Sequence, residues 1–360
     1  MERGLKAAAN CPTTLPLAET LPRQQPVRIL SLDAGGIRGI LELNVLAELE
    51  ERSGKPISEL FDLITGTSTG SVIGISLLLP GPDGKPLHSA HEMLDLYVQQ
   101  IRTFGEGPWY HPVLTLDGLL GPEYRTSRGV AFLRDVMGTT TMAELLCDIV
   151  IPAASIDDLS PRFMTSRRSP DGSDFTINDN IVAANVALAT TAAPGLIAPM
   201  RLRNVEGQLL FTAADGGLFA YDPTPLAISL ALQRYPDRSL IVLSLGTGDL
   251  ETTIDTSSAG SWGSIHWLKH ATSLGIRPSV RYTNAILSHV AGRPGSQLTH
   301  YLRINPKVPS QFNQSLYSSK EVVTQLNQIG AQSVKDNDQA ISEIISLLSK
   351  NETEKSSTAP

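Results

Sequence analysis

Short apolar runs alternate with segments of helical spacing along this chain, and the first two runs each end in a glycine-rich turn. Residues 27–32 form the first run, which leads into Asp33-Ala34-Gly35-Gly36-Ile37-Arg38-Gly39. Over residues 40–52, leucines recur every three residues with glutamates between them, and Gly54 follows. This pattern predicts a buried strand, a tight loop and an amphipathic helix that ends at the glycine.

The second apolar run, residues 60–64, precedes the pentapeptide Gly66-Thr67-Ser68-Thr69-Gly70, and residues 71–79 then predict an apolar helix. Strand, loop, helix, strand, turn and helix therefore follow one another. This order is typical of a parallel sheet with helices on both faces, so we expect an α/β protein.

Further strands and helices are predicted along the rest of the chain. We expect strands over residues 145–155, 163–168, 174–177, 209–212 and 239–245, and helices over residues 91–102, 130–137, 182–191 and 225–234. We interpret residues 26–350 as one domain, with an insertion over 83–145 and a mostly helical part over 262–350. Residues 1–25 and 351–360 are predicted to be a disordered leader and tail.

Composition narrows the classes of partner. The 360 residues carry a formal net charge of −7 at pH 7, which argues against nucleic acid and against electrostatic docking to anionic lipid, and leaves contact with neutral lipid open. The two cysteines, Cys11 and Cys147, indicate no disulfide framework and fit a reducing compartment. We find neither a secretory signal nor an apolar stretch long enough to span a bilayer, so we expect a cytoplasmic protein.

Ser68 is the first candidate for chemistry. The glycines at positions 66 and 70 let the backbone turn sharply between a strand and a helix, which exposes the serine hydroxyl as a nucleophile. The N-terminus of the following helix favours negative charge at the same place. Because loops match this pentapeptide by chance, the apolar strand before it and the apolar helix after it carry the prediction.

The glycine-rich loop has three interpretations. It cradles a nucleotide phosphate, it is only a tight turn, or the N–H groups of Gly35, Gly36 and Ile37 bind the oxyanion of a tetrahedral intermediate. The nucleotide interpretation has less support, because Ala34 occupies the first glycine position of the dinucleotide fingerprint and the P-loop lysine is missing. Arg38 is a candidate brace for the loop or a contact for a substrate phosphate.

A serine nucleophile needs a base. Seven histidines are candidates, and none of them follows a strand in a recognisable turn: His88, His91, His111, His266, His270, His289 and His300. Asp215 is better placed, since it follows an apolar strand and precedes Gly216 and Gly217, which leave its carboxylate accessible. A carboxylate acts as the base directly if burial raises its pKa toward the working pH, although Asp-Gly-Gly taken alone is also the sequence of a simple turn.

Together these motifs resemble those of the patatin-like phospholipase family. That family pairs a D-G-G-G-x-R/K-G loop with G-x-S-x-G and D-G-G/A motifs, which correspond here to residues 33–39, 66–70 and 215–217. Residues 190–194 and 243–248 are similar to two further segments of the family.

Two positions depart from the family pattern. Ala34 replaces a glycine, which would shift the loop if that position requires a positive φ. Tyr221-Asp222-Pro223 stands where many members carry Asn-Asn-Pro, so the support of Asp215 is expected to differ. Neither departure removes a catalytic group.

The resemblance implies a three-layer α/β/α fold with a mostly parallel central sheet, and a serine–aspartate dyad that needs no histidine, metal or cofactor. Asp215 would take the proton from Ser68, which attacks an acyl ester, while Gly35 and Gly36 hold the oxyanion and water then releases the acyl group. The implied substrates are membrane or micellar glycerolipids: phospholipids, galactolipids or simpler acyl esters.

Three alternatives remain open. The chain is a Ser-His-Asp α/β-hydrolase in which His266 or another late histidine is the base, it binds or stores lipid without catalysis, or it transfers the acyl group to an alcohol instead of water. Peripheral contact with a membrane would involve apolar side chains of the insertion, which are otherwise expected to be buried: Trp109, Tyr110, Leu114, Leu116, Leu119 and Leu120.

Overall fold

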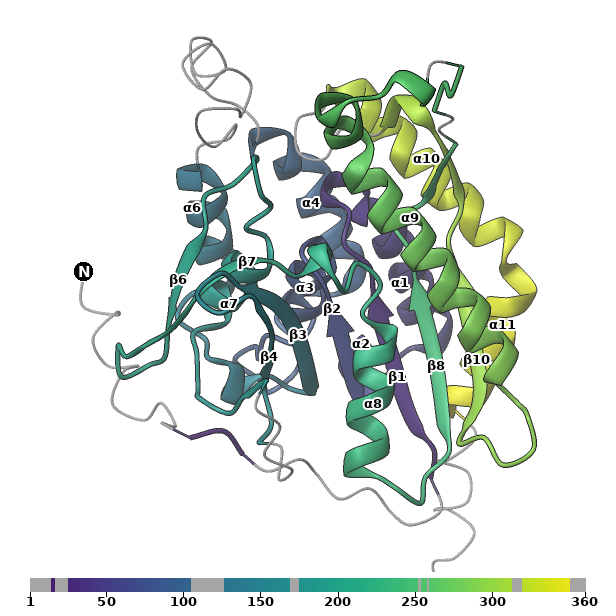
Figure 1. The fold of residues 1–360 in the computed structure, drawn as a ribbon. Coiled ribbons are helices and arrows are strands. Elements are labelled where there is room, and N and C mark those ends of the chain that lie inside the picture. Colours follow the sequence, from purple (N-terminus) through teal and green to yellow (C-terminus); the bar gives the residue numbers. More distant parts are fainter. Residues whose placement is uncertain are drawn as a thin grey trace, which may run out of the picture.

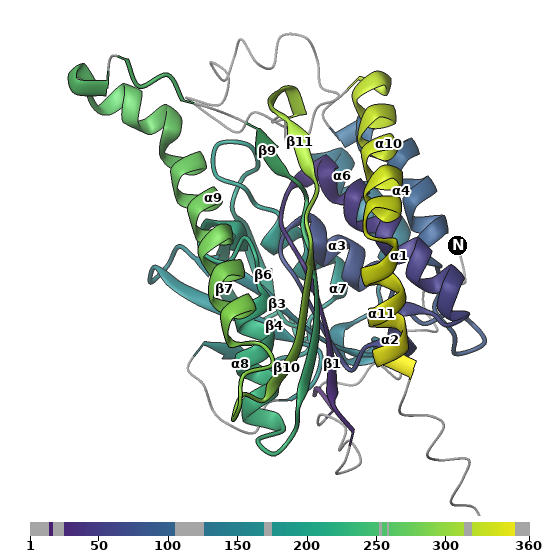
Figure 2. The same cartoon turned by 90° about the vertical axis from the view of Figure 1, so that its right-hand side faces the viewer.

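The computed structural model describes residues 14–16, 25–104, 126–168, 175–251, 254–257, 259–312 and 319–349. In these residues a twisted sheet lies between two layers of helices (Figures 1 and 2). The predicted α/β/α architecture is therefore confirmed.

The main sheet contains strands from the whole length of the described chain. They are β1 (Val27–Leu32), β2 (Leu63–Gly66), β3 (Asp148–Ser155), β4 (Ser160–Thr165), β5 (Thr176–Ile177), β6 (Met200–Arg203), β7 (Leu209–Asp215), β8 (Leu240–Leu245) and β10 (Leu298–Ile304). Along the sheet the order is β10-β8-β1-β2-β3-β4-β5, with β7 also paired to β3 and β6 paired to β7. All neighbours from β10 to β3 are parallel, whereas β4 and β7 run antiparallel to β3. The sheet is thus mostly parallel, as predicted.

Helices cover both faces of this sheet. They are α1 (Gly39–Ser53), α2 (Ile57–Leu60), α3 (Thr69–Ser76), α4 (Ala90–Phe104), α6 (Thr126–Met137), α7 (Ala183–Thr190), α8 (Thr224–Arg234), α9 (Ser264–Val290), α10 (Lys320–Asp336) and α11 (Asp338–Ser349). Figure 2 shows α8 and α9 on one face, and α1, α3, α10 and α11 on the other. A small pair of strands, β9 (Asp249–Glu251) and β11 (Lys307–Pro309), follows the ends of β8 and β10.

Alternate residues of the central strands enter two separate cores. In β1, Val27 and Ile29 pack with Leu230 of α8, whereas Leu30 and Leu32 join the larger core that includes α1. Successive side chains of a strand point to opposite faces, so a strand buried on both faces reads as one continuous apolar run. This is why the runs at 27–32 and 239–245 were recognisable in the sequence.

The structure changes several predicted boundaries. The second strand begins at Leu63 and not at residue 60, because Ile57–Leu60 form the short helix α2. The strand β6 was not predicted. The segment over 262–350, expected to be mostly helical, also contributes β10 to the edge of the main sheet. Its alternating polar residues hid it, because an edge strand is buried on fewer sides than a central one.

Parts of the predicted leader, insertion and tail lie outside the described residues. This includes the candidate membrane rim within 105–125 and all of residues 351–360. Within the leader, Thr14 pairs with Asp179 and Leu15 is buried, so these residues pack against the domain. The described part of the chain contains no helix long and apolar enough to cross a membrane.

Candidate active site

Ser68 lies on the turn between β2 and α3, in a conformation that side chains rarely adopt. Its φ is 52° and its ψ is −116°. A Cβ atom added at Gly66 would lie 2.4 Å from the carbonyl oxygen of Gly70, and one added at Gly70 would lie 2.5 Å from that of Leu32. Both glycines of the pentapeptide are therefore required because backbone segments meet there without room for a side chain.

Thr190, at the end of α7, holds the backbone of this turn. Its hydroxyl donates to the carbonyl oxygen of Pro152 at 2.7 Å and accepts the N–H of Ser68 at 3.1 Å. Thr190 is fully buried. In the sequence, Thr190 stands out only as part of a segment similar to one of the family. Its contact with Ser68 is visible only in the structure.

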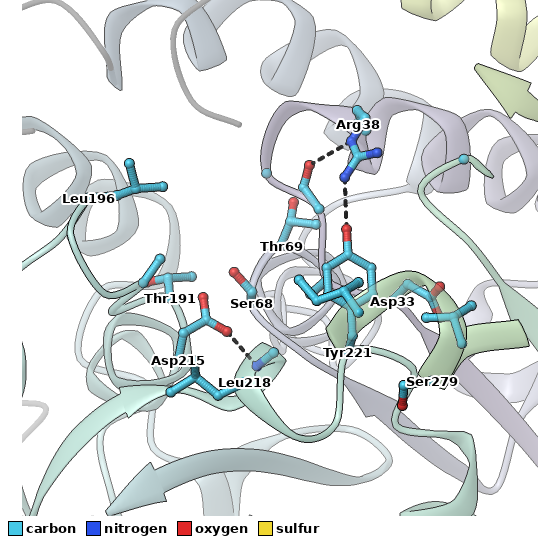
Figure 3. Close-up of a pocket in the computed structure, with 18 of the residues that line it drawn as sticks. Asp33, Arg38, Ser68, Thr69, Thr191, Leu196, Asp215, Leu218, Tyr221 and Ser279 are labelled. Atoms are coloured by element: carbon cyan, nitrogen blue, oxygen red, sulfur yellow. Dashed lines mark hydrogen bonds between the residues drawn. The ribbon is translucent and has the colours of Figure 1, made fainter. Parts of the chain in front are cut away.

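Asp215, the last residue of β7, faces Ser68 (Figure 3). Its carboxylate accepts the N–H of Gly217 at 2.6 Å. Burial raises the pKa of Asp215 from its usual 3.8 to about 6, although the Gly217 N–H and the nearby Ser68 hydroxyl oppose the shift. A Cβ atom at Gly216 would lie 2.3 Å from the carbonyl oxygen of Pro152, so the Asp-Gly-Gly turn is packed tightly against β3.

The glycine-rich loop follows β1 and faces the same space. Gly35 and Gly36 have φ values of 154° and 60°. Among the described residues, their N–H groups donate to no other group of the protein, and both glycines line the cavity in front of Ser68. Two N–H groups are thus available to a ligand. The next residues of the loop pack into the protein interior. The Ile37 side chain is fully buried, and a Cβ atom added at Gly39 would lie 2.7 Å from the Thr69 hydroxyl oxygen.

Both departures from the family pattern are accommodated. Among the described non-glycine residues only Ser68 and Leu159 have a positive φ, so Ala34 sits in an ordinary backbone conformation. Tyr221 supports the loop and not Asp215, since its carbonyl oxygen accepts the N–H of Ala34 at 2.9 Å and its hydroxyl accepts from Arg38 at 2.8 Å. Figure 3 shows this contact with Arg38, whose Nε also approaches the carbonyl oxygen of Gly35 at 3.4 Å.

Two further side chains hold the loop: Tyr97, which the sequence did not single out, and Thr247, which it marked only as part of a segment similar to the family. The Tyr97 hydroxyl of α4 donates to the carbonyl oxygen of Gly36 at 3.0 Å. The Thr247 hydroxyl, which follows β8, donates to the carbonyl oxygen of Ala34 at 2.5 Å. These bonds fix the carbonyl groups of the loop, so its N–H groups are turned toward the cavity. No local pattern at Tyr97 signals this role, because the contact spans 61 residues.

A buried ion cluster lies beneath the loop. Arg303 of β10 donates to the two carboxylate oxygens of Asp33 at 2.5 and 3.2 Å and approaches Asp222 at 3.3 Å. Glu42 of α1 accepts the backbone N–H of Asp33 at 2.7 Å. Burial raises the pKa of Asp33, and the charge of Arg303 opposes that rise. The C-terminal strand is thereby connected to the residue that begins the loop.

A cavity of about 1030 Å³ opens in front of Ser68. It is lined by the glycine-rich loop, Asp215, Arg38 and residues of α6 and α9. Among the described residues that line it there is no histidine. Over the same described part of the chain, no group of three or more His, Cys, Asp or Glu side chains is placed to hold a metal ion.

A serine at a positive φ, on the turn from a parallel strand to a helix, places this chain among the α/β proteins with a nucleophile-elbow turn. Comparison of the sequence with known protein families shows which family of these proteins the chain belongs to. Residues 30–228 match the family described as patatin-like phospholipase. Because the match spans more than half of the chain, the protein belongs to this family, and membership points to hydrolysis of lipid esters.

Curated relatives agree with this assignment. Patatin-like protein 4 of Arabidopsis thaliana is 29% identical over 273 residues, which cover 69% of this chain and 67% of the relative. Patatin-like protein 2 of the same plant is also 29% identical, over 69% of this chain and 66% of the relative. Patatin-like protein 2 of Oryza sativa subsp. indica is 28% identical over 276 residues.

Solved structures give weaker similarity. Human GIVD cytosolic phospholipase A2, in complex with methyl gamma-linolenyl fluorophosphonate, is 13% identical and has a TM-score of 0.43, covering 92% of this chain and 60% of that chain. VipD from Legionella pneumophila is 12% identical with a TM-score of 0.38, over 92% of this chain and 70% of that chain. The family assignment rests on the sequence match.

Proposed function

We propose that this protein is a lipid acyl hydrolase that cleaves acyl esters of glycerolipids through a covalent acyl-serine and a Ser68–Asp215 dyad. The observation that carries the proposal is the position of the Ser68 side chain opposite the buried Asp215 carboxylate, whose pKa is raised to about 6. A carboxylate with such a pKa is deprotonated at neutral pH and is still basic enough to accept a proton in the transition state.

The proposed reaction has two steps. In the first, Asp215 takes the proton of Ser68 as its oxygen attacks the ester carbonyl carbon, and the N–H groups of Gly35 and Gly36 bind the oxyanion. The tetrahedral intermediate collapses, the proton passes from Asp215 to the departing alkoxide, and the acyl group remains on Ser68. In the second, Asp215 takes a proton from water as its oxygen attacks the acyl-serine carbonyl carbon. The second tetrahedral intermediate then collapses, the bond to Ser68 breaks, the proton passes from Asp215 to the Ser68 oxygen, and the fatty acid is released.

The cavity supports a lipid substrate. Its lining includes apolar side chains from α3, α6, α7 and the following loop: Val72, Val130, Leu133, Leu188, Leu196 and Ile197. Such a wall suits an acyl chain, because burying each methylene stabilises the complex by about 0.8 kcal/mol. The absence of histidine among the described lining residues favours the dyad over a Ser-His-Asp triad.

The test is covalent labelling with a serine-directed fluorophosphonate, read by intact mass and by the site of the adduct. We expect one adduct, on Ser68, in the wild-type protein, none in Ser68→Ala and greatly slowed labelling in Asp215→Asn. Ser288→Ala, which changes an exposed serine of α9, is the matched control and should label like wild type.

The same variants should rank alike in ester hydrolysis: full activity in wild type and Ser288→Ala, none in Ser68→Ala, and greatly reduced activity in Asp215→Asn. Loss of activity in His266→Ala or His270→Ala equal to that in Asp215→Asn would favour the triad and contradict the dyad. A folded wild-type protein that neither labels nor hydrolyses any acyl ester would leave lipid binding without catalysis as the function.

A further inference from the structure

Tyr97 is a buried polar side chain that the proposed reaction does not use. It lies on α4, where Ala90, Met93 and Tyr97 form one buried stripe against the main core. Their spacing of three and four residues places them on one face of the helix. The N–H of Ala90, the first residue of α4, donates to the carboxylate of Glu50 on α1 at 2.6 Å. Helix α4 is thereby anchored, and it holds the Tyr97 hydroxyl at a fixed point beside the cavity.

The Tyr97 hydroxyl contacts both halves of the site. It donates to the carbonyl oxygen of Gly36 in the glycine-rich loop at 3.0 Å, and it hydrogen-bonds to the hydroxyl of Thr69, the residue after Ser68. A carbonyl oxygen can only accept, so the single proton of Tyr97 points to Gly36 and the Thr69 hydroxyl donates to Tyr97. Burial raises the pKa of the Tyr97 hydroxyl, which therefore keeps this proton. A directed chain of hydrogen bonds thus leads from the nucleophile turn to the loop.

The loop needs such support because its central residues are two glycines. Gly35 and Gly36 have φ values of 154° and 60°, and neither has a side chain whose packing would fix the backbone. Thr247 holds the carbonyl group before their N–H groups, and Tyr97 holds the carbonyl group after them. Donors of an oxyanion hole are effective when they are fixed before the reaction begins. The alignment of these N–H groups therefore depends on side chains outside the loop.

We infer that Tyr97 is a positioning residue that aligns the oxyanion-binding N–H groups of the loop with the Ser68 hydroxyl. This inference rests on the proposed function and adds a residue that acts through Gly36 and Thr69. Because one hydroxyl is bonded to both segments, neither can shift without breaking a hydrogen bond to the other. Helix α4, which contains none of the three motifs, thus sets the distance between the two halves of the site.

The first test is Tyr97→Phe, which removes the hydroxyl and keeps the ring. The Gly36 carbonyl oxygen still accepts the N–H of Gly39 in this variant, so the loop stays folded but is less well aligned. We expect kcat for an uncharged acyl ester to fall about tenfold with little change in KM, since the oxyanion forms only in the transition state. An unchanged kcat would overturn the inference. A rise in KM alone would overturn it too, because Tyr97 would then only contact the substrate.

Tyr282→Phe is the matched control. Tyr282 lies on α9, is 68% exposed and is not among the described residues that line the cavity, so loss of its hydroxyl should leave kcat at the wild-type value. An equal fall of kcat in the control would mean that the effect does not depend on the place of Tyr97, and the inference would be wrong.

Variants of Thr69 test the other end of the chain. Thr69→Val removes the hydroxyl and should lower kcat, whereas Thr69→Ser should keep it. In Tyr97→Phe/Thr69→Val, kcat should be no lower than in Tyr97→Phe, because the same link is already broken. Losses that multiply would show that the two hydroxyls act independently, which contradicts the coupling.

Amide hydrogen exchange separates this inference from the proposed function. The N–H groups of Arg38 in the loop and of Gly70 in the nucleophile turn donate to backbone carbonyl oxygens. Both amides should exchange faster in Tyr97→Phe than in wild type or the control variant, whether or not the protein hydrolyses esters. Unchanged exchange at both amides would overturn the positioning role even if kcat falls. A wild-type protein without activity would refute the proposed function alone, and faster exchange in Tyr97→Phe would still support the coupling.

Discussion

At the scale of single residues, the site combines two features that cost stability. Asp215 is only 7% exposed, and no cation is among the groups that shift its pKa. Ser68 occupies a backbone conformation that side chains avoid. Such features persist where the surrounding structure imposes them, and they are common at functional sites. Each leads to a measurement that separates its effect on function from its effect on folding.

The raised pKa of Asp215 predicts how activity depends on pH. The proposed base must be deprotonated, so kcat/KM for an uncharged acyl ester should rise with pH through a midpoint near 6 and then level off. An uncharged ester avoids titration of the substrate. A midpoint near 4 would mean that the carboxylate is solvated in the free protein, and that burial does not set its basicity.

The same pKa predicts that Asp215→Asn stabilises the fold. Because the folded pKa lies above the unfolded one, the folded protein binds more protons between about pH 4 and pH 6, and stability falls as pH rises through that range. Asparagine removes this cost, which is on the order of 3 kcal/mol for two pKa units, and its side-chain oxygen can still accept from Gly217. Urea unfolding at pH 8 should show the gain, and at pH 4 the gain should largely disappear.

The positive φ of Ser68 gives a second comparison. Ser68→Ala and Ser68→Gly both remove the hydroxyl, so both should be inactive. Glycine adopts φ 52° without strain, and after its greater unfolded-state entropy is counted we expect it to be about 1 kcal/mol more stable than alanine here. Equal unfolding free energies for the two variants would contradict strain at this turn.

At the scale of elements, the site depends on how closely two strands and two helices approach one another. The end of β2 meets the start of α3 at Gly66, and α3 meets the end of β1 at Gly70. Gly39 brings the start of α1 against α3 in the same way. These contacts place the glycine-rich loop beside Ser68, so the glycines of both motifs act by permitting close packing as well as sharp turns.

Gly70→Ala is expected to be severely destabilised or unable to fold. Its Cβ would lie 2.5 Å from the backbone oxygen of Leu32, which cannot move without displacing β1. Gly275→Ala in α9 is the control, because nothing lies within 4 Å of its Cβ and alanine favours a helix by about 1 kcal/mol. Thermal unfolding of the two variants should therefore shift in opposite directions. A Gly70→Ala protein with wild-type stability would show that α3 can withdraw from β1.

At the scale of the whole molecule, the C-terminal part is connected to the site by charge. Arg303 is 6% exposed and reaches from the edge strand β10 to Asp33, the first residue of the glycine-rich loop, and to Asp222, which follows the Asp215 turn. Residues beyond 228 lie outside the region that matches the family, yet they supply this arginine and the α9 residues that line the cavity. The loop and the Asp215 turn are thereby held by a residue that neither motif contains.

Arg303→Met is predicted to cost about 3–5 kcal/mol at neutral pH, because two buried carboxylates lose their cation. The cost should be smaller at pH 5, since burial raises the pKa of Asp33 and lets it take a proton. Urea unfolding at both values of pH measures this. Arg201→Met, at an exposed position of β6, should change stability little, and Asp33→Asn should recover part of the loss when combined with Arg303→Met.

The sequence by itself determined the family, the order of the main elements, and the segments that carry Ser68, Asp215 and the glycine-rich loop. These are local properties: strands buried on both faces read as apolar runs, and tight turns require glycine. Only the tertiary structure decided which distant side chains support them, such as Thr190 on Ser68, Tyr97 and Tyr221 on the loop, and Arg303 on Asp33. The edge strand β10 and the place of α9 along the cavity were also decided only by the tertiary structure. Such contacts join residues far apart in the chain, and no spacing rule along a sequence encodes them.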